Sequence, residues 1–130
     1  MRNIVIAAAG LASLVAVPAL ARESAWMGIG VRPINATTTS QTIEVSDTNV
    51  PRETMFCTDD AQVQILTADF HYRNGDTQSV PVRTRIRAGD CSRVIGLRNR
   101  TAELASVTFT ADPASLNPTG ATARVRVLVR

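Results

Sequence analysis

The sequence predicts an all-β protein, an antiparallel β-sandwich of about seven short strands. Apolar and polar residues alternate with a period of two, most clearly between Leu66 and Ile86, as they do on a strand with one buried face. Short runs of this kind are separated by turns rich in Pro, Gly, Asn and Asp. No stretch shows a helical period long enough to predict a helix, so two packed sheets are the natural arrangement.

The N-terminal residues 1–21 are typical of a secretory signal peptide. They contain one Arg, an apolar run from Ile4 to Val17, Pro18, and a small-residue cleavage site that ends at Ala21. An uncleaved membrane anchor is the alternative, but the run is shorter than the roughly 20 residues of a membrane span. We therefore expect residues 22–130 to form a single periplasmic or secreted domain with no transmembrane span.

Three strands are predicted before the strongly alternating region, at residues 26–31, 42–45 and 54–57. Pro33 should end the first of these, because proline cannot donate to a strand ladder. A Thr/Ser-rich loop covers residues 35–41, and the Asp59-Asp60 pair should form the turn that follows the third strand.

Residues 66–86 are predicted to form a β-hairpin with a three-residue loop, Arg73-Asn74-Gly75, and Gly75 left-handed. A two-residue turn at Asn74-Gly75 would place the apolar residues of the two strands on opposite faces. The longer loop avoids this. It pairs Phe70 with Gln78, Ala68 with Val80 and Leu66 with Val82.

After the hairpin, a turn at residues 88–90 should return the chain as a strand over 93–97, with Ile95 and Leu97 on one face. A polar turn at 98–101 precedes a strand around Val107 and Phe109. Residues 111–120 contain two prolines and a glycine and are expected to form a loop. The last strand, 124–130, should face the core with its valines.

Two cysteines, Cys57 and Cys91, are predicted to form a disulfide, because an exported chain meets an oxidising compartment. The bridge would close a loop of about 34 residues and stabilise the fold by roughly 3–4 kcal/mol. Free thiols and a redox pair are the alternatives, although the C-x-x-C spacing of redox pairs is absent.

A set of turn residues and strand positions recurs in a recognisable order. It comprises Trp26, Gly28, Ile43-x-Val45, Tyr72-x-Asn74-Gly75, Val82-Arg83-x-x-Ile86-x-Ala88-Gly89-x-x-Ser92-Arg93-x-Ile95-x-Leu97, Arg100, Val107 and the closing x-Val-x-Val strand. In these positions the chain resembles a family of small exported bacterial β-sandwich domains of unknown function. The resemblance implies a fold and an extracytoplasmic location but no catalytic residues, and it does not extend to the cysteine pair or to residues 111–120.

We predict no catalytic, cofactor-binding or metal-binding residues. The single histidine, His71, shares a strand face with Asp69, and only Thr77 or Gln78 could join them from across the hairpin. A metal-dependent or hydrolytic enzyme centred on His71 is the less favoured alternative. The sequence contains no nucleophile elbow, P-loop, dinucleotide fingerprint or EF-hand.

The sharpest surface feature is a row of arginines, Arg83, Arg85 and Arg87. Further arginines that could extend it are Arg73, Arg124, Arg126 and Arg130. Such a stripe could bind an anionic glycan, lipopolysaccharide phosphates or an acidic protein. Nucleic acid is not expected, because no aromatic residues are interleaved for base stacking. The alternative is a solvated face whose charges protect a sheet edge, balanced by Asp69, Asp76 and Glu103.

The charge of the chain does not by itself require a polyanionic partner, since the formal net charge is only +3. Every basic residue is arginine, which suits bidentate recognition of carboxylates or phosphates but also fits a genome that favours arginine codons. We therefore predict a non-enzymatic, exported binding or structural module of the periplasm or cell envelope that acts through its surface.

Overall fold

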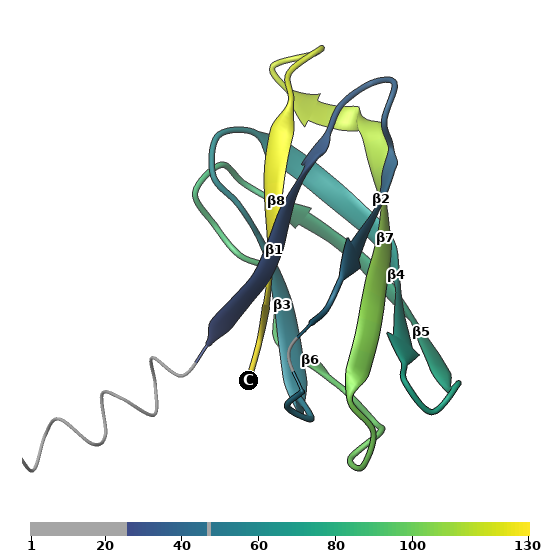
Figure 1. Ribbon diagram of the computed structural model, residues 1–130. Helices are drawn as coiled ribbons and strands as arrows, with labels where there is room; N and C mark the ends of the chain where they lie inside the picture. Colours follow the sequence, from purple (N-terminus) through teal and green to yellow (C-terminus); the bar gives the residue numbers. More distant parts are fainter. Residues whose placement is uncertain (1–25, 47) are drawn as a thin grey trace, which may run out of the picture.

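The computed structural model describes residues 26–46 and 48–130, in which the regular elements are all strands. Eight strands form two antiparallel sheets of four, in the orders β1-β8-β3-β6 and β2-β7-β4-β5 (Figure 1). The strands are β1 (Met27–Ile34), β2 (Ser40–Glu44), β3 (Glu53–Thr58), β4 (Gln62–Tyr72), β5 (Thr77–Ile86), β6 (Ile95–Gly96), β7 (Leu104–Asn117) and β8 (Ala123–Val129).

The predicted all-β sandwich is thus confirmed, with eight strands in place of about seven. The predicted signal peptide, residues 1–21, lies outside the described residues. No element in the described part of the chain is a helix with the length and hydropathy needed to cross a membrane.

The core lies between the two sheets and is built from the inward faces of their strands. In β8, Val125, Val127 and Val129 are buried in alternation, as the sequence predicts. All three phenylalanines are fully buried, and the rings of Phe56 and Phe109, which come from different sheets, lie 5.6 Å apart between centroids. Contacts of this kind hold the layers together because each aromatic side chain removes a large apolar area from water.

The hairpin of β4 and β5 has the predicted loop and most of the predicted register. Phe70 pairs with Gln78 and Ala68 with Val80, and Gly75 has the expected left-handed backbone with φ of +95°. The amide of Gly75 donates to the carbonyl of Tyr72 at 3.0 Å.

The third predicted pair, Leu66 with Val82, is wrong because the register shifts there. Ile65 pairs with Thr84 and Thr67 pairs with Pro81, which places Val82 and Arg83 together opposite Leu66. Arg83 adopts the positive φ of 45° that such a bulge can require. In β4 the buried positions change from odd to even numbers at Leu66, because Leu66 has no partner in β7, and Leu66 is itself only half-buried. The sequence hid this change because Ile65 and Leu66 are both apolar.

Two predicted boundaries are also wrong. Pro33 does not end β1, which continues to Ile34 and pairs Pro33 with Arg124. Because β1 is an edge strand, it tolerates a residue that lacks an N–H group. Residues 111–117 belong to β7 and not to a loop. There, residues 113–116 stand opposite Val63 alone, and the hydroxyl of Ser115 accepts from the amide of Gln64 at 2.7 Å.

The predicted disulfide between Cys57 and Cys91 is present, with the Cα atoms 3.9 Å apart. It lies where the chain leaves β5 and crosses to the other sheet, in which β6 pairs with β3. Ser92 continues the contact, because its amide donates to the carbonyl of Phe56 at 2.6 Å and its hydroxyl accepts from the amide of Phe56 at 3.0 Å. Ile95 and Leu97 are then both buried, as predicted.

We expect the double substitution Cys57→Ala/Cys91→Ala to lower the free energy of unfolding by roughly 3–4 kcal/mol, because it releases a 34-residue loop in the unfolded chain. Urea denaturation followed by tryptophan fluorescence measures this. Reduction of the unsubstituted protein is the control and should give a similar loss, since the chain contains no other cysteine. An unchanged midpoint in both experiments would contradict the prediction.

Gly30 is required where β1 passes over β2. A Cβ atom at this position would lie 2.8 Å from Cγ2 of the buried Ile43. We expect Gly30→Ala to destabilise the protein by about 1–3 kcal/mol, because a packed core residue has to move. Gly28→Ala is the matched control: its Cβ would lie 3.6 Å from Leu128, an ordinary contact, and stability should change little. Equal thermal midpoints for the two variants would show the prediction to be wrong.

Candidate functional site

The two predicted arginine rows lie on different sheets. Arg83 and Arg85 belong to β5, at the edge of one sheet, and Arg87 directly follows that strand. Arg124 and Arg126 belong to β8, which lies between β1 and β3 in the other sheet. Since the outer faces of a sandwich point in opposite directions, the structure does not bring the rows together into one stripe.

The arginines in β8 and directly after it are paired with carboxylates. Nη2 of Arg126 lies 2.9 Å from Oδ1 of Asp59, and Nε of Arg124 lies 3.6 Å from Oδ2 of Asp60. Arg130 likewise pairs with Glu53 at 2.8 Å, and its guanidinium lies over the ring of Trp26. Exposed pairs of this kind stabilise a fold by at most about 1 kcal/mol, but they neutralise the local charge.

Arg73, the remaining arginine considered for the stripe, also has partners. It pairs with Glu103 at 3.1 Å and donates to the carbonyl of Val45 at 2.6 Å. This side chain therefore fixes the hairpin to neighbouring segments and does not extend the β5 row.

The arginines of the β5 row are exposed and unpaired. Among the described residues, no carboxylate oxygen lies within 4.0 Å of the guanidinium groups of Arg83, Arg85 or Arg87. Arg93 joins them from the crossing segment, because it donates to the carbonyl of Val82 and to Oγ1 of Thr84, each at 2.7 Å. We call these four residues, Arg83, Arg85, Arg87 and Arg93, the basic edge.

The basic edge is also unsuited to accepting another strand. Pro81 has no N–H group to offer a ladder, and the bulge at Arg83 interrupts the regular backbone. Arg93 further occupies the carbonyl of Val82. Natural proteins use such devices to prevent pairing at sheet edges, so this edge presents side chains and not a free backbone.

A second feature is a polar pocket of about 470 Å³ between the β4–β5 hairpin and the loop that precedes β7. Its lining residues are Tyr72, Asp76, Thr77, Gln78, Arg98, Asn99, Arg100 and Thr101. The sequence indicated only turns here, because nothing local shows that residues 98–101 fold against the hairpin.

Side-chain hydrogen bonds hold the two walls of the polar pocket together. Nδ2 of Asn99 donates to Oδ2 of Asp76 at 3.0 Å, across the pocket. Oε1 of Gln78 accepts from the amide of Arg98 at 2.8 Å, and Nε2 of Gln78 donates to the carbonyl of Gly96. Oδ1 of Asn99 accepts from the amides of Thr101 and Ala102, which fixes the loop itself.

Tyr72 lies in the pocket wall with an unsatisfied polar group. Its side chain is only 4% exposed, and its hydroxyl makes no hydrogen bond with any described residue. The backbone amide of Asn99 lies close to the hydroxyl but does not reach hydrogen-bond geometry. Burial raises the pKa of the Tyr72 phenol; the charge of Arg98 and the Asn99 backbone partly offset this, and Asp76 adds to it.

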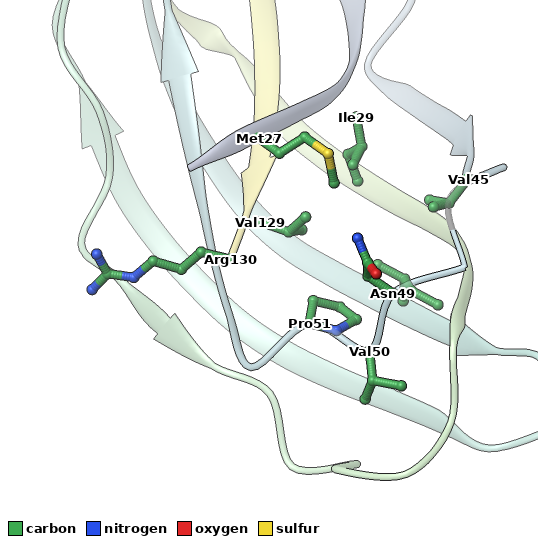
Figure 2. Close-up of a pocket in the computed structure, with 9 residues that line it drawn as sticks. Met27, Ile29, Val45, Asn49, Val50, Pro51, Val129 and Arg130 are labelled. Carbon is green, nitrogen blue, oxygen red and sulfur yellow. The ribbon is translucent and has the colours of Figure 1, made fainter. Parts of the chain in front are cut away.

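An apolar groove of about 420 Å³ lies at the end of the sandwich where β1, β8 and residues 49–51 meet. Figure 2 shows Met27, Ile29, Val45 and Val129 around one space, with the guanidinium of Arg130 directed away from them. Met27 and Val50 are 39% and 37% exposed. The volume is within the usual range for small-molecule sites. The sequence gives no periodic signal for it, because the lining residues come from separate strands and a loop.

Of the two residues expected across the hairpin from His71, the structure places Thr77 beside it and not Gln78. Its Nδ1 lies 3.2 Å from Oγ1 of Thr77, whereas Gln78 is buried and its side chain is bound to Gly96 and Arg98. Within residues 26–46 and 48–130, no three His, Cys, Asp or Glu side chains gather in a way that could hold a metal ion.

Stability should depend on pH through Tyr72. The pKa of the Tyr72 phenol is higher in the folded protein than in the unfolded chain, so the unfolded chain loses the phenolic proton first. The contribution of Tyr72 to the free energy of unfolding is therefore complete below about pH 10. It declines as the pH rises through the folded-state pKa. The decline should reach at most about 1.4 kcal/mol per pH unit. The chain has no lysine and its cysteines are bridged, so Tyr72 is the one side chain expected to titrate here.

Urea denaturation at a series of pH values measures this decline. Tyr72→Phe is the control, and its stability should be flat over the same interval because the titrating group is gone. Parallel pH profiles for the two proteins would rule out the role assigned to Tyr72.

Comparison with known proteins gives a family but no function. No curated protein matches the sequence. Among solved structures, the fold is similar to AlgX of Pseudomonas aeruginosa, with 14% identity, a TM-score of 0.47, and coverage of 80% of this chain and 26% of that one. It is also similar to the Drosophila NLP core, with 14% identity, a TM-score of 0.30, and coverage of 79% and 96%.

Both structural likenesses are too loose to transfer a function, and the chain spans about a quarter of the length of the AlgX chain. A protein-family model matches the sequence over residues 8–129, which is nearly its whole length. The chain therefore belongs to the family described as a domain of unknown function, DUF2541.

Proposed function

We propose that the protein is a non-enzymatic binding module of the cell envelope that engages anionic groups through the basic edge. The observation that carries this proposal is a contrast between two strands. The arginines of β8 are each paired with a carboxylate, whereas Arg83, Arg85 and Arg87 have no such partner among the described residues.

The unpaired row suits an external anion. Like charges that are gathered along one strand repel one another, and this repulsion is relieved when a negative partner binds. Guanidinium groups present paired donors that match carboxylate and phosphate oxygens. Because the backbone at this sheet edge is unsuited to pairing with another strand, a partner would contact these arginine side chains.

The envelope location is supported by the composition of residues 1–21 and by the disulfide between Cys57 and Cys91. In that compartment the available anions include lipopolysaccharide phosphates, acidic glycans and acidic proteins. Of these, we favour an anionic glycan or lipopolysaccharide, because spaced guanidinium groups on one strand suit a partner with repeated charges.

The non-enzymatic role is supported by the surroundings of His71. Its recorded hydrogen-bond partner is the hydroxyl of Thr77, which neither orients an imidazole as a carboxylate does nor completes a metal site. An enzyme centred on His71 is therefore the weaker hypothesis, and replacement of His71 by Ala should leave ligand binding unchanged.

Binding to immobilised lipopolysaccharide, measured by surface plasmon resonance at low and high salt, tests the proposal. We expect Arg83→Gln/Arg85→Gln/Arg87→Gln to weaken binding by roughly tenfold or more, because a charge-assisted hydrogen bond contributes about 1.5–3 kcal/mol. Salt should weaken binding by the unsubstituted protein, since exposed charges are screened. The matched control is Arg124→Gln/Arg126→Gln, which removes paired arginines and should change binding little. Equal effects of the two variants, or none, would reject the basic edge as the site.

A further inference from the structure

We propose that the polar pocket is a second binding site, one that takes a carboxylate or phosphate group of a hydrophilic ligand. The hydroxyl of Tyr72 would donate a hydrogen bond to this oxyanion, and Arg98 and Arg100 would supply positive charge. The inference does not depend on the basic edge, because it rests on different residues and a different observation.

The hydroxyl of Tyr72 is buried without a hydrogen-bond partner among the described residues. Buried tyrosine hydroxyls usually have a hydrogen-bond partner, because an unpaired buried polar group is destabilising. Tyr72 has none among the described residues, although the rest of its side chain packs in the core. A phenylalanine would pack equally well there, so the hydroxyl is not explained by the fold.

The Tyr72 side chain lines the polar pocket. The groups that influence its ionisation are the charges of Arg98 and Asp76 and the backbone amide of Asn99, and all three residues line the pocket. The hydroxyl therefore belongs to the pocket end of the Tyr72 side chain. A ligand oxygen in the pocket would supply the acceptor that the protein does not.

The charged residues that line the polar pocket are two arginines and one aspartate. Arg98 and Arg100 are exposed, and no carboxylate lies within 4.0 Å of their guanidinium groups among the described residues. Asp76 opposes an anion, but its Oδ2 already accepts from Nδ2 of Asn74 at 3.2 Å and from Nδ2 of Asn99 at 3.0 Å. The pocket is thus lined by two arginines and by one carboxylate that is already hydrogen-bonded at Oδ2, and this balance of charge favours an anion.

Hydrogen bonds between its walls hold the polar pocket in shape without a ligand. Asn99 and Gln78 fix the loop of Arg98 and Arg100 against the hairpin, so a ligand meets an ordered wall that has to shift only enough to uncover the Tyr72 oxygen, which is buried in the free protein. Most other polar atoms in the walls are already used internally. The groups left for a ligand include the Tyr72 hydroxyl and the guanidinium groups of Arg98 and Arg100, and these donors favour an oxyanion over a neutral or cationic group.

Nuclear magnetic resonance of the full chain tests the inference, because Tyr72 is the only tyrosine and its ring signals are unambiguous. The protein is titrated with sodium phosphate and, separately, with sodium glucuronate, at constant ionic strength. We expect a saturable shift of the Tyr72 ring signals and of the Arg98 and Arg100 side-chain N–H signals with at least one probe. The probe that saturates identifies the oxyanion as phosphate or carboxylate, and no saturation with either would overturn the proposal.

Three variants separate ligand binding from folding. Tyr72→Phe should weaken binding roughly tenfold or more, since the hydrogen bond to a charged group is lost, and its melting temperature should stay the same or rise. Arg98→Gln should also weaken binding, detected through the Tyr72 signals. Arg124→Gln is the control and should leave the affinity unchanged, because Arg124 lies on the other sheet and is paired with Asp60.

The variants also define how the proposal fails. If Tyr72→Phe, followed through the Arg98 and Arg100 signals, bound the probe as tightly as the unsubstituted protein, the hydroxyl would have no role. A clear fall in the melting temperature of Tyr72→Phe would show that the hydroxyl has a structural partner and would also overturn the proposal. A loss of affinity in Arg124→Gln equal to that in Arg98→Gln would mean that the anions bind by general charge, outside the pocket.

Discussion

The structure depends on one short crossing segment, residues 89–93, which connects the two sheets on the side of β3 and β5. Cys91 is bridged to Cys57 of β3, and Ser92 exchanges hydrogen bonds with Phe56. Arg93 then donates to β5 on the other sheet. Three consecutive residues are thus fixed in different ways: Cys91 by the disulfide, Ser92 by hydrogen bonds to Phe56, and Arg93 by the hydrogen bonds of its side chain. Together they fix the point from which the following residues, 95–101, are placed.

Both the basic edge and the polar pocket follow from that placement. Arg93 reaches the bulge of β5 because its neighbours are tied to β3, so the edge carries a fourth arginine and a covered carbonyl. Farther along, Gln78 holds residues 96 and 98, and this places Arg98 and Arg100 in the lining of the pocket that Tyr72 also lines. The apolar groove lies close by, since Leu104 lines it and pairs with Tyr72 in the adjacent strand. One end of the sandwich therefore carries polar and apolar concave surfaces side by side.

The arrangement of charge shows how topology changes the meaning of a sequence pattern. Alternating arginines occur on β5 and on β8, and both rows are exposed to some degree. In β8 the neighbouring turn brings Asp59 and Asp60 within reach, so the arginines are neutralised. In β5, an edge strand, no described carboxylate lies close enough to pair with the arginines. Two similar sequences thus have different electrostatic environments, and this difference depends on which strands lie beside them.

The sequence by itself determined the features that depend on local chemistry: the alternating strands, the left-handed Gly75, the pairs beside that loop, and the two cysteines that could be joined. Only the tertiary structure decided features that depend on a distant neighbour, such as the bulge at Leu66, the tolerance of Pro33 at an edge, and the extension of β7 with Ser115. It likewise decided that Tyr72 meets Arg98. The alternation of apolar and polar residues predicts which way a side chain points. The residue that it contacts depends on the strand order, which arises from packing of residues far apart in the chain.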